Sequence, residues 1–191
     1  MKKFIKKSLV ASAALIGVLS LGACSKNSSD NADDDEEDLG FNEVTIFEGE
    51  TAAFLNVNAV YFQAVSMTDG KSASDSDCHL ELDVSAGKND FGYGVGDWVP
   101  YLTVSYSVTK DTFTQSGTFM PMAASDGPHY GANIKLDGNG TYKLSFTITF
   151  PDTTSTYLLH TDNTGPEGHA FPAAVTIGPY NWNYKSGAWN E

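Results

Sequence analysis

Apolar and polar side chains alternate along most of the chain after its first 40 residues, and no long stretch repeats with the period of a helix. Within residues 98–109, every second side chain from Leu102 to Val108 is apolar and those between them are polar. Residues 142–150 alternate in the same way. A period of two predicts half-buried strands of an antiparallel sheet.

The other alternating segments are short, and turn-forming sequences such as Asp69-Gly70 and Gly165-Pro166 separate them. These segments are Glu43–Glu48, Ala53–Met67, His79–Ala86, Thr114–Met120, Tyr130–Leu136 and Ala173–Tyr180. About eight short strands with polar turns predict an all-β fold, an immunoglobulin-like antiparallel β-sandwich. The Cys–Trp–Cys pattern of antibody domains is absent from the sequence.

The N-terminal residues have the pattern of an export signal. Four lysines come first, the apolar run Leu9–Leu21 follows, and Leu21-Gly22-Ala23-Cys24 resembles a bacterial lipoprotein processing site. The apolar run is too short to span a bilayer comfortably. We therefore predict a lipoprotein signal peptide over residues 1–23, lipidation of Cys24, and a membrane-anchored product that faces the periplasm or the cell surface. An ordinary secretory signal with an incidental cysteine is the alternative.

Residues 24–40 contain Cys24 and a run of acidic and small polar residues with almost no apolar side chain. Such a segment cannot bury enough apolar surface to become ordered, so it is predicted to be a disordered acidic tether. Residues 41–191 then form one domain of ordinary size.

Charge and cysteine content narrow the functional classes. The formal net charge is -13 and there is no arginine, whereas nucleic-acid binding needs a basic surface, so no nucleic-acid partner is expected. If Cys24 carries the lipid, Cys78 has no disulfide partner in the chain. Strand parity places Cys78 on the core side as a buried thiol, and a metal thiolate is the alternative.

Met122 precedes His129 by seven residues, and a turn over residues 125–128 lies between them. A tight turn brings its two ends close together. A thioether and an imidazole suit a soft or borderline metal, copper above all. A methionine at a strand end, taken by itself, is more often a packing residue.

Further candidate ligands lie on other segments. His79, Glu81 and Asp83 occupy alternate positions, so they share the strand face that points away from the core, and a plain polar outer face is the alternative. His160 ends an apolar run at a turn-rich loop, where ligands are common but a solvated side chain fits as well. His169 has no identifiable partner. Close-spaced zinc pairs and Cys-x-x-Cys are absent, so a metal site would have to combine distant segments.

The sequence offers little support for catalysis. It has no Gly-x-Ser-x-Gly elbow and no phosphate-binding loop, so we expect no enzyme. A redox role toward iron is the alternative, and no residue pattern supports it independently. A different class of function is a surface adhesion or host-ligand-binding lipoprotein. Exposed aromatic side chains near the C-terminus would serve that role, namely Tyr180, Trp182, Tyr184 and Trp189.

Several motifs together resemble a known family. In order, they are Tyr61-Phe-Gln-Ala-Val65, His79-Leu-Glu81, Val99-Pro-Tyr-Leu102, Phe119-Met-Pro-Met122, Asp126-Gly-Pro-His-Tyr-Gly-Ala-Asn133 and His160-Thr-Asp162. The chain is similar to the bacterial periplasmic iron-transport proteins, the FetP-like copper-binding partners of iron permeases, a family that also includes a treponemal surface lipoprotein. The resemblance runs from about Val44 to Tyr180.

The resemblance implies an immunoglobulin-like sandwich that forms a homodimer, with a copper site near the dimer interface. Carried over by position, the copper ligands would be His79, Met122, His129 and His160. Glu81 would be an alternative ligand or a ligand of a second metal, with Fe, Mn or Zn as candidates. The implied role is high-affinity iron uptake beside a membrane iron permease.

Overall fold

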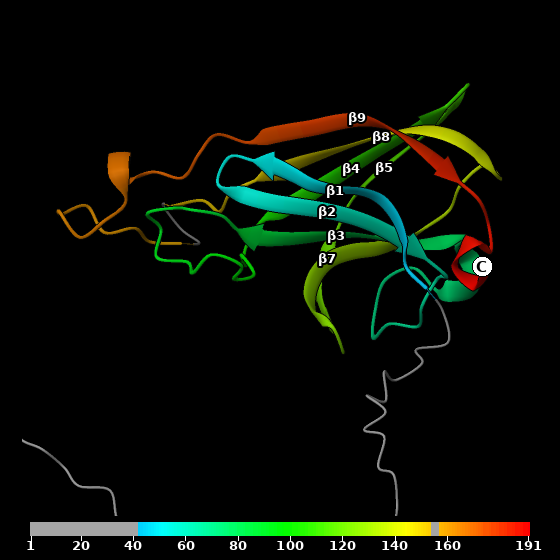
Figure 1. Cartoon of the computed structure of the whole chain (residues 1–191), viewed down its shortest axis with the longest axis horizontal. Coiled ribbons are helices and arrows are strands. Elements are labelled where there is room, and N and C mark those ends of the chain that lie inside the picture. Colours follow the sequence, from blue (N-terminus) through cyan, green and yellow to red (C-terminus); the bar gives the residue numbers. More distant parts are fainter. Residues whose placement is uncertain (1–41, 154–156) are drawn as a thin grey trace, which may run out of the picture. The chain divides into compact units, whose positions relative to one another are not determined.

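The computed structural model describes residues 42–153 and 157–191, which form two antiparallel sheets (Figure 1). The five-stranded sheet has the order β1 (Val44–Ala52), β2 (Leu55–Phe62), β3 (Cys78–Ala86), β7 (Gly127–Ile134), β6 (Met120–Ala124). The four-stranded sheet has the order β5 (Phe113–Thr118), β4 (Thr103–Lys110), β8 (Gly140–Thr149), β9 (Val175–Tyr184). Three 3-10 helices are η1 (Ala73–Asp75), η2 (Glu167–His169) and η3 (Ala188–Asn190). The predicted signal peptide, Cys24 and the tether lie outside the described residues.

The core lies between the two sheets, as the alternation predicts. Leu80, Leu82 and Val84 of β3 are buried, and so are Leu144 and Phe146 of β8. Every second side chain of a strand points to the same face, so each sheet contributes one apolar face to the shared core. The predicted all-β sandwich is confirmed.

One strand was not predicted. The chain leaves the four-stranded sheet after β5, buries Phe119, and then enters the five-stranded sheet as β6. Pro121 lies in β6 and argues against a central strand, because it cannot donate a ladder hydrogen bond. An edge strand tolerates it, and β6 is the edge of its sheet.

The C-terminal aromatic residues correct a second expectation. Trp182, Tyr184 and Trp189 are buried, so they do not form the exposed surface required by the adhesion hypothesis. The rings of Trp182 and Tyr61 lie 5.2 Å apart between centroids, and those of Trp182 and Tyr142 lie 5.8 Å apart. Every second side chain in the C-terminal half of β9 points into the core, so Trp182 and Tyr184 become part of it.

Cys78 is a free cysteine that points into the core, where it is fully buried. Burial raises the pKa of its thiol far above the ordinary value, and Asp77 raises it further. The thiol is therefore protonated at neutral pH and takes the predicted packing role on the face opposite His79.

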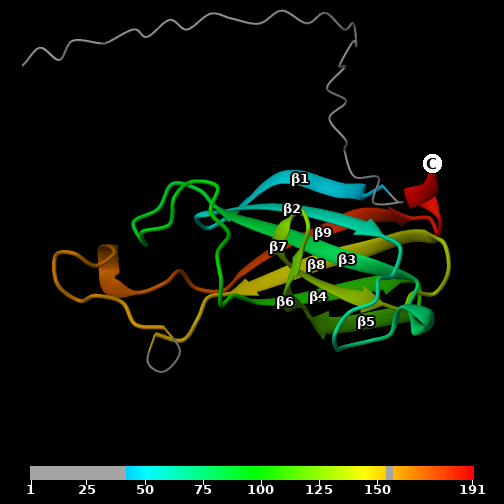
Figure 2. The same ribbon diagram turned by 90° about the horizontal axis from the view of Figure 1, so that it is seen from below.

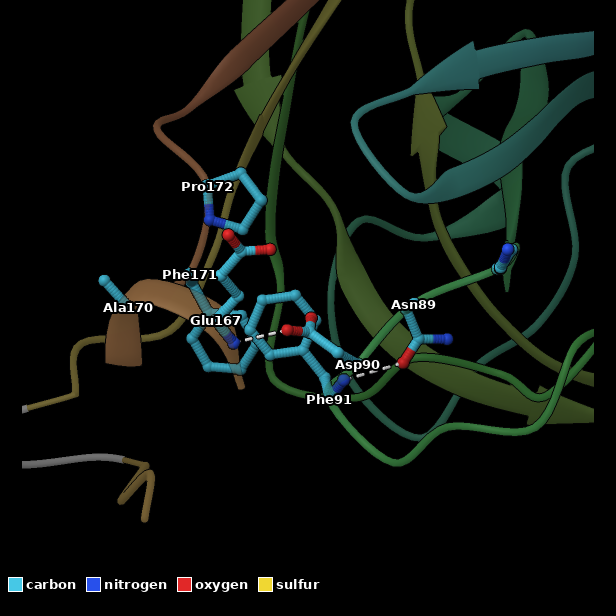
Figure 3. Close-up of a pocket in the computed structure, with 8 residues that line it drawn as sticks. Asn89, Asp90, Phe91, Glu167, Ala170, Phe171 and Pro172 are labelled. Atoms are coloured by element: carbon cyan, nitrogen blue, oxygen red, sulfur yellow. Dashed lines mark hydrogen bonds between the residues drawn. The ribbon is translucent and has the colours of Figure 1, made fainter. Parts of the chain in front are cut away.

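The segment between β8 and β9 contains no strand among its described residues, and it extends beyond the sheets (Figures 1 and 2). It packs against the loop that follows β3. The Phe91 and Phe171 rings stack with 4.7 Å between their centroids, and the backbone N–H of Glu167 donates to the Asp90 carboxylate (Figure 3). Within residues 42–153 and 157–191, no helix has the length and apolarity needed to cross a membrane.

Candidate metal centre

The candidate ligands gather on the outer face of the five-stranded sheet, where three neighbouring strands are in register. His79 lies opposite Asn133 and Glu81 lies opposite Gly131 across β3 and β7. Met122 lies opposite His129 across β6 and β7. Directly opposed residues of an antiparallel pair share a face, so the imidazoles, the carboxylate and the thioether point to the same side.

Two histidines converge on one carboxylate. His129 Nδ1 lies 3.2 Å from Glu81 Oε1, and His79 Nε2 lies 4.0 Å from Glu81 Oε2. One potential ligand atom from each of these three residues lies within 4.8 Å of the other two. The structure thus brings His79, Glu81 and His129 into one cluster. Met122 does lie beside His129, but the turn between them is Ser125-Asp126 alone, because Gly127 and Pro128 already belong to β7.

Burial of this cluster rules out a plain polar outer face. His79 is 1% exposed, Glu81 is 2% exposed and His129 is 5% exposed. They line a cavity of about 820 Å³ together with the segment Val65–Lys71 and residues of the β6–β7 hairpin, including Met122. The outer face of β3 is therefore covered at this point, and the cavity leaves room for a ligand.

The donor set fits a metal ion. The Nε2 atom of His79 is buried and has no hydrogen-bond partner among the described residues. Its other ring nitrogen, Nδ1, lies 3.0 Å from Asn133 Oδ1. A buried polar atom without a partner is costly, and a metal ion would satisfy the lone pair of an unprotonated Nε2. Imidazole and thioether ligands together favour copper over hard cations.

The electrostatics favour neutral imidazoles. Burial lowers the pKa of His79 to about 4, against a smaller raising effect of the hydrogen bond with Asn133. Burial also lowers the pKa of His129, although Asp126 and Asp83 partly offset the effect. Both rings therefore hold lone pairs for a metal at neutral pH.

Glu81 behaves in the opposite way. Burial, followed by the neighbouring Asp83, raises the pKa of Glu81 to about 9. Burial raises the pKa of Asp83 and of Glu43 as well. The metal-free site thus holds a proton at Glu81 near neutral pH, and a bound cation would replace that proton.

A second group of carboxylates adjoins the histidines. Ligand oxygens of Glu43, Glu81 and Asp126 lie within 4.8 Å of one another, and Glu43 and Asp126 are exposed. Glu81 belongs to both groups, so it links the histidine cluster to an acidic rim. Oxygen ligands of this kind suit harder cations than the histidine–methionine side does.

His160 does not join the cluster within one chain. It is exposed in the segment between β8 and β9, where its Nδ1 lies 2.9 Å from Thr164 Oγ1. It does not line the cavity that holds His79 and His129. His169 ends η2 in the same segment and is exposed.

Four residues of the site had no predicted role in it. Gly131 and Asn133 follow His129 at intervals of two, so their place on the same face could have been inferred from strand parity. Glu43 and Asp126 come from a strand start and a turn, and no periodic pattern places them. Long-range packing brings them to Glu81.

Fold and site together define a class: a β-sandwich protein with a histidine, carboxylate and thioether centre on the outer face of one sheet. The chain belongs to the Fe2+ transport protein family, whose model matches residues 40–186. This confirms the family indicated by the sequence motifs.

Relatives and a solved structure agree with the family. A 34 kDa membrane antigen of Treponema pallidum is 40% identical over 168 residues, which are 83% of this chain and 82% of that protein. A UPF0423 protein of Brucella abortus is 47% identical over 115 residues, which are 57% of this chain. The match spans 63% of that relative's length. A copper-bound variant of FetP from uropathogenic Escherichia coli strain F11 superposes with a TM-score of 0.68 at 38% identity, covering 76% of this chain and 94% of that chain.

Proposed function

We propose that this protein is an exported, periplasmic or surface-facing metal-binding protein that binds copper and assists iron uptake. The cluster of two buried, neutral histidines around Glu81, with His79 Nε2 lacking a partner in the described part of the chain, is the observation that carries the proposal. Family membership and the copper-bound FetP structure support it.

In this proposal His79, His129 and Met122 hold the copper. Copper would supply one-electron chemistry that the protein's own side chains lack. His79 and His129 present neutral imidazoles, and Met122 contributes a soft thioether from the neighbouring strand. Glu81 holds a proton when no cation is bound and would hold a cation as a carboxylate. The role is binding and handling of metal, not enzymatic turnover.

Iron is the proposed cargo. The exposed carboxylates of Glu43 and Asp126 lie on the solvent side of Glu81, and their oxygens suit iron or another hard divalent metal such as manganese. The overall charge of -13 would attract cations toward this rim. A second metal, with Fe, Mn or Zn as candidates, would bind here beside the copper.

We further propose that the protein works as a lipid-anchored homodimer beside a membrane iron permease. His160 supports the dimer, because family resemblance makes it a ligand and yet it lies outside the cavity of its own chain. A second copy would supply His160 to complete the site. Cys24, outside the described residues, would carry the lipid.

Copper titration of the mature protein tests the proposed site. His129→Ala removes an imidazole that lies 3.2 Å from Glu81, so copper affinity should fall at least tenfold, a factor worth about 1.4 kcal/mol. His169→Ala is the matched control, because it removes an exposed histidine outside the cluster. Equal affinities for wild type and His129→Ala would overturn the assignment.

A further inference from the structure

We propose that Asn133 is a positioning residue that places the proton of His79 on Nδ1 and so turns Nε2 toward the metal. It would also connect this ligand to the segment Val65–Lys71, which lines the cavity. The inference deepens the proposed metal site and rests on it only for the effect on copper affinity. The placement of the proton can be measured without metal.

The hydrogen bonds of Asn133 determine the orientation of its amide. Its Nδ2 donates to the Val65 carbonyl at 2.8 Å and to the Lys71 carbonyl at 2.9 Å. Carbonyl oxygens can only accept, so the NH₂ group must face them. The opposite orientation would set an amide oxygen against two carbonyl oxygens. Oδ1 therefore faces the other way, where it also accepts the Val65 backbone N–H at 3.2 Å.

The orientation of the amide then determines the tautomer of His79. Asn133 Oδ1 lies 3.0 Å from His79 Nδ1, and a carbonyl oxygen cannot donate. Nδ1 therefore carries a proton, whereas the buried Nε2 has no hydrogen-bond partner among the described residues that could accept one from it. A neutral imidazole carries one proton, so Nδ1–H donates to Asn133 and Nε2 keeps its lone pair.

The sequence leaves room for the Nε2 end of the His79 ring. Nε2 is buried without a hydrogen-bond partner in the described residues, and it lies over Gly131. A Cβ at position 131 would lie 2.6 Å from Nε2. Phe62 packs on the ring from β2, with 5.1 Å between centroids. Asn133, Gly131 and Phe62 thus hold one ring in one orientation.

The same amide joins two parts of the molecule. Asn133 lies on β7, His79 lies on β3, and the two carbonyls that Asn133 binds belong to the connection between β2 and β3. Loss of the Asn133 side chain would remove the hydrogen bond to the His79 imidazole and those to the segment Val65–Lys71 at the same time. Partners that orient a metal-bound histidine typically matter by ten- to a hundredfold in metal affinity.

Nuclear magnetic resonance of the imidazole nitrogens tests the proposal. Long-range proton–nitrogen spectra of metal-free wild type at pH 7, assigned by the loss of signals in His79→Gln, should show His79 with a protonated Nδ1 and an unprotonated Nε2. In Asn133→Leu, which has a similar size but no polar atoms, His79 should show a mixture of tautomers. Copper affinity should fall by roughly ten- to a hundredfold.

Asn133→Asp separates the two contributions. Its carboxylate still accepts a hydrogen bond from Nδ1–H but cannot donate to the carbonyls of Val65 and Lys71, so the tautomer of His79 should remain that of wild type. Several outcomes would overturn the proposal. One is a proton on Nε2 in metal-free wild type, which needs no variant to fold. Others are a folded Asn133→Leu protein that keeps the wild-type tautomer, or one that keeps wild-type copper affinity.

If wild type shows the expected tautomer but His129→Ala has no effect on copper, the proposed function fails while the placement of the proton stands. The two failures are therefore distinguishable.

Discussion

Three side chains with shifted pKa values meet in the centre of the site. His79 and His129 are neutral because burial penalises their charged forms, and Glu81 is protonated for the same reason. Removal of charges from water is costly unless they are paired, so the metal-free site avoids charge. A bound cation would favour the ionised carboxylate of Glu81, so metal binding is expected to release the proton of Glu81.

The free energy of unfolding of the metal-free protein should therefore depend on Glu81. The folded protein holds a proton on Glu81 up to about pH 9, whereas the unfolded chain releases it near the ordinary value. The contribution of Glu81 to the free energy of unfolding is complete below the pKa of the unfolded chain, and it is lost as the pH rises toward 9. Through this one group, the free energy of unfolding falls by at most about 1.4 kcal/mol per pH unit.

Comparison with Glu81→Gln isolates this effect. The variant cannot ionise at position 81, so its stability should fall less steeply between pH 7 and pH 8.5 in denaturant unfolding experiments. His79 acts in the other direction and at lower pH, because its depressed pKa costs stability as pH falls from about 6.5 toward 4. Parallel profiles of the two proteins above pH 7 would contradict the assigned protonation of Glu81.

The strands set the spacing of the site. β3, β7 and β6 lie side by side, and their register aligns His79 with Asn133 and Met122 with His129. Gly131 in the middle of β7 leaves the space above the sheet that the His79 ring occupies. A strand glycine where another group approaches closely is a common arrangement.

Substitution of Gly131 tests this arrangement. A Cβ there would meet His79 Nε2 at 2.6 Å and the Leu80 carbonyl oxygen at 3.1 Å, so Gly131→Ala should push the imidazole off its position. We expect copper affinity to fall about tenfold or more. The double variant Gly131→Ala/His79→Ala should bind copper no more weakly than His79→Ala alone. A further loss in the double variant would show that the glycine acts by another route.

Sequence periodicity predicted the elements of the fold better than it predicted the site. The parity of β3 separated Leu80 and Leu82 from His79 and Glu81, and the short turn placed Met122 beside His129. Both are local properties of strands and hairpins.

The burial of the outer face could not be predicted in this way. It depends on the segment Val65–Lys71, which lines the cavity although its first residues were predicted to continue a strand that ends at Phe62. The amide of Asn133 holds that segment, and hydrogen bonds between residues more than sixty positions apart leave no periodic signal. The C-terminal aromatic side chains were also expected at the surface, although Trp182 and Tyr184 occupy the inward positions of β9 and complete the core.

The proposed homodimer concerns the whole molecule. His160 belongs to the segment between β8 and β9 and is not among the residues that line the cavity. If a second copy supplies His160, copper affinity should depend on protein concentration, weakening as the dimer dissociates in sedimentation experiments.

Mixing two variants tests this arrangement. His160→Ala and His129→Ala should each bind copper weakly when alone. Their mixed dimer should regain one strong site, formed by His79 and His129 of the first variant and by His160 of the second. Absence of recovery in a mixed dimer, or full affinity of His160→Ala alone, would contradict the shared site.

The central claim is that copper binds between His79, His129 and Met122. Crystals of the mature protein loaded with copper, measured at the copper absorption edge, test it most directly. We expect an anomalous-difference peak beside His79 Nε2, in contact with the His129 ring and the Met122 thioether. A peak elsewhere, for example at His169 or at the exposed carboxylates alone, would contradict this assignment. So would the absence of a peak in crystals of a protein that binds copper in solution.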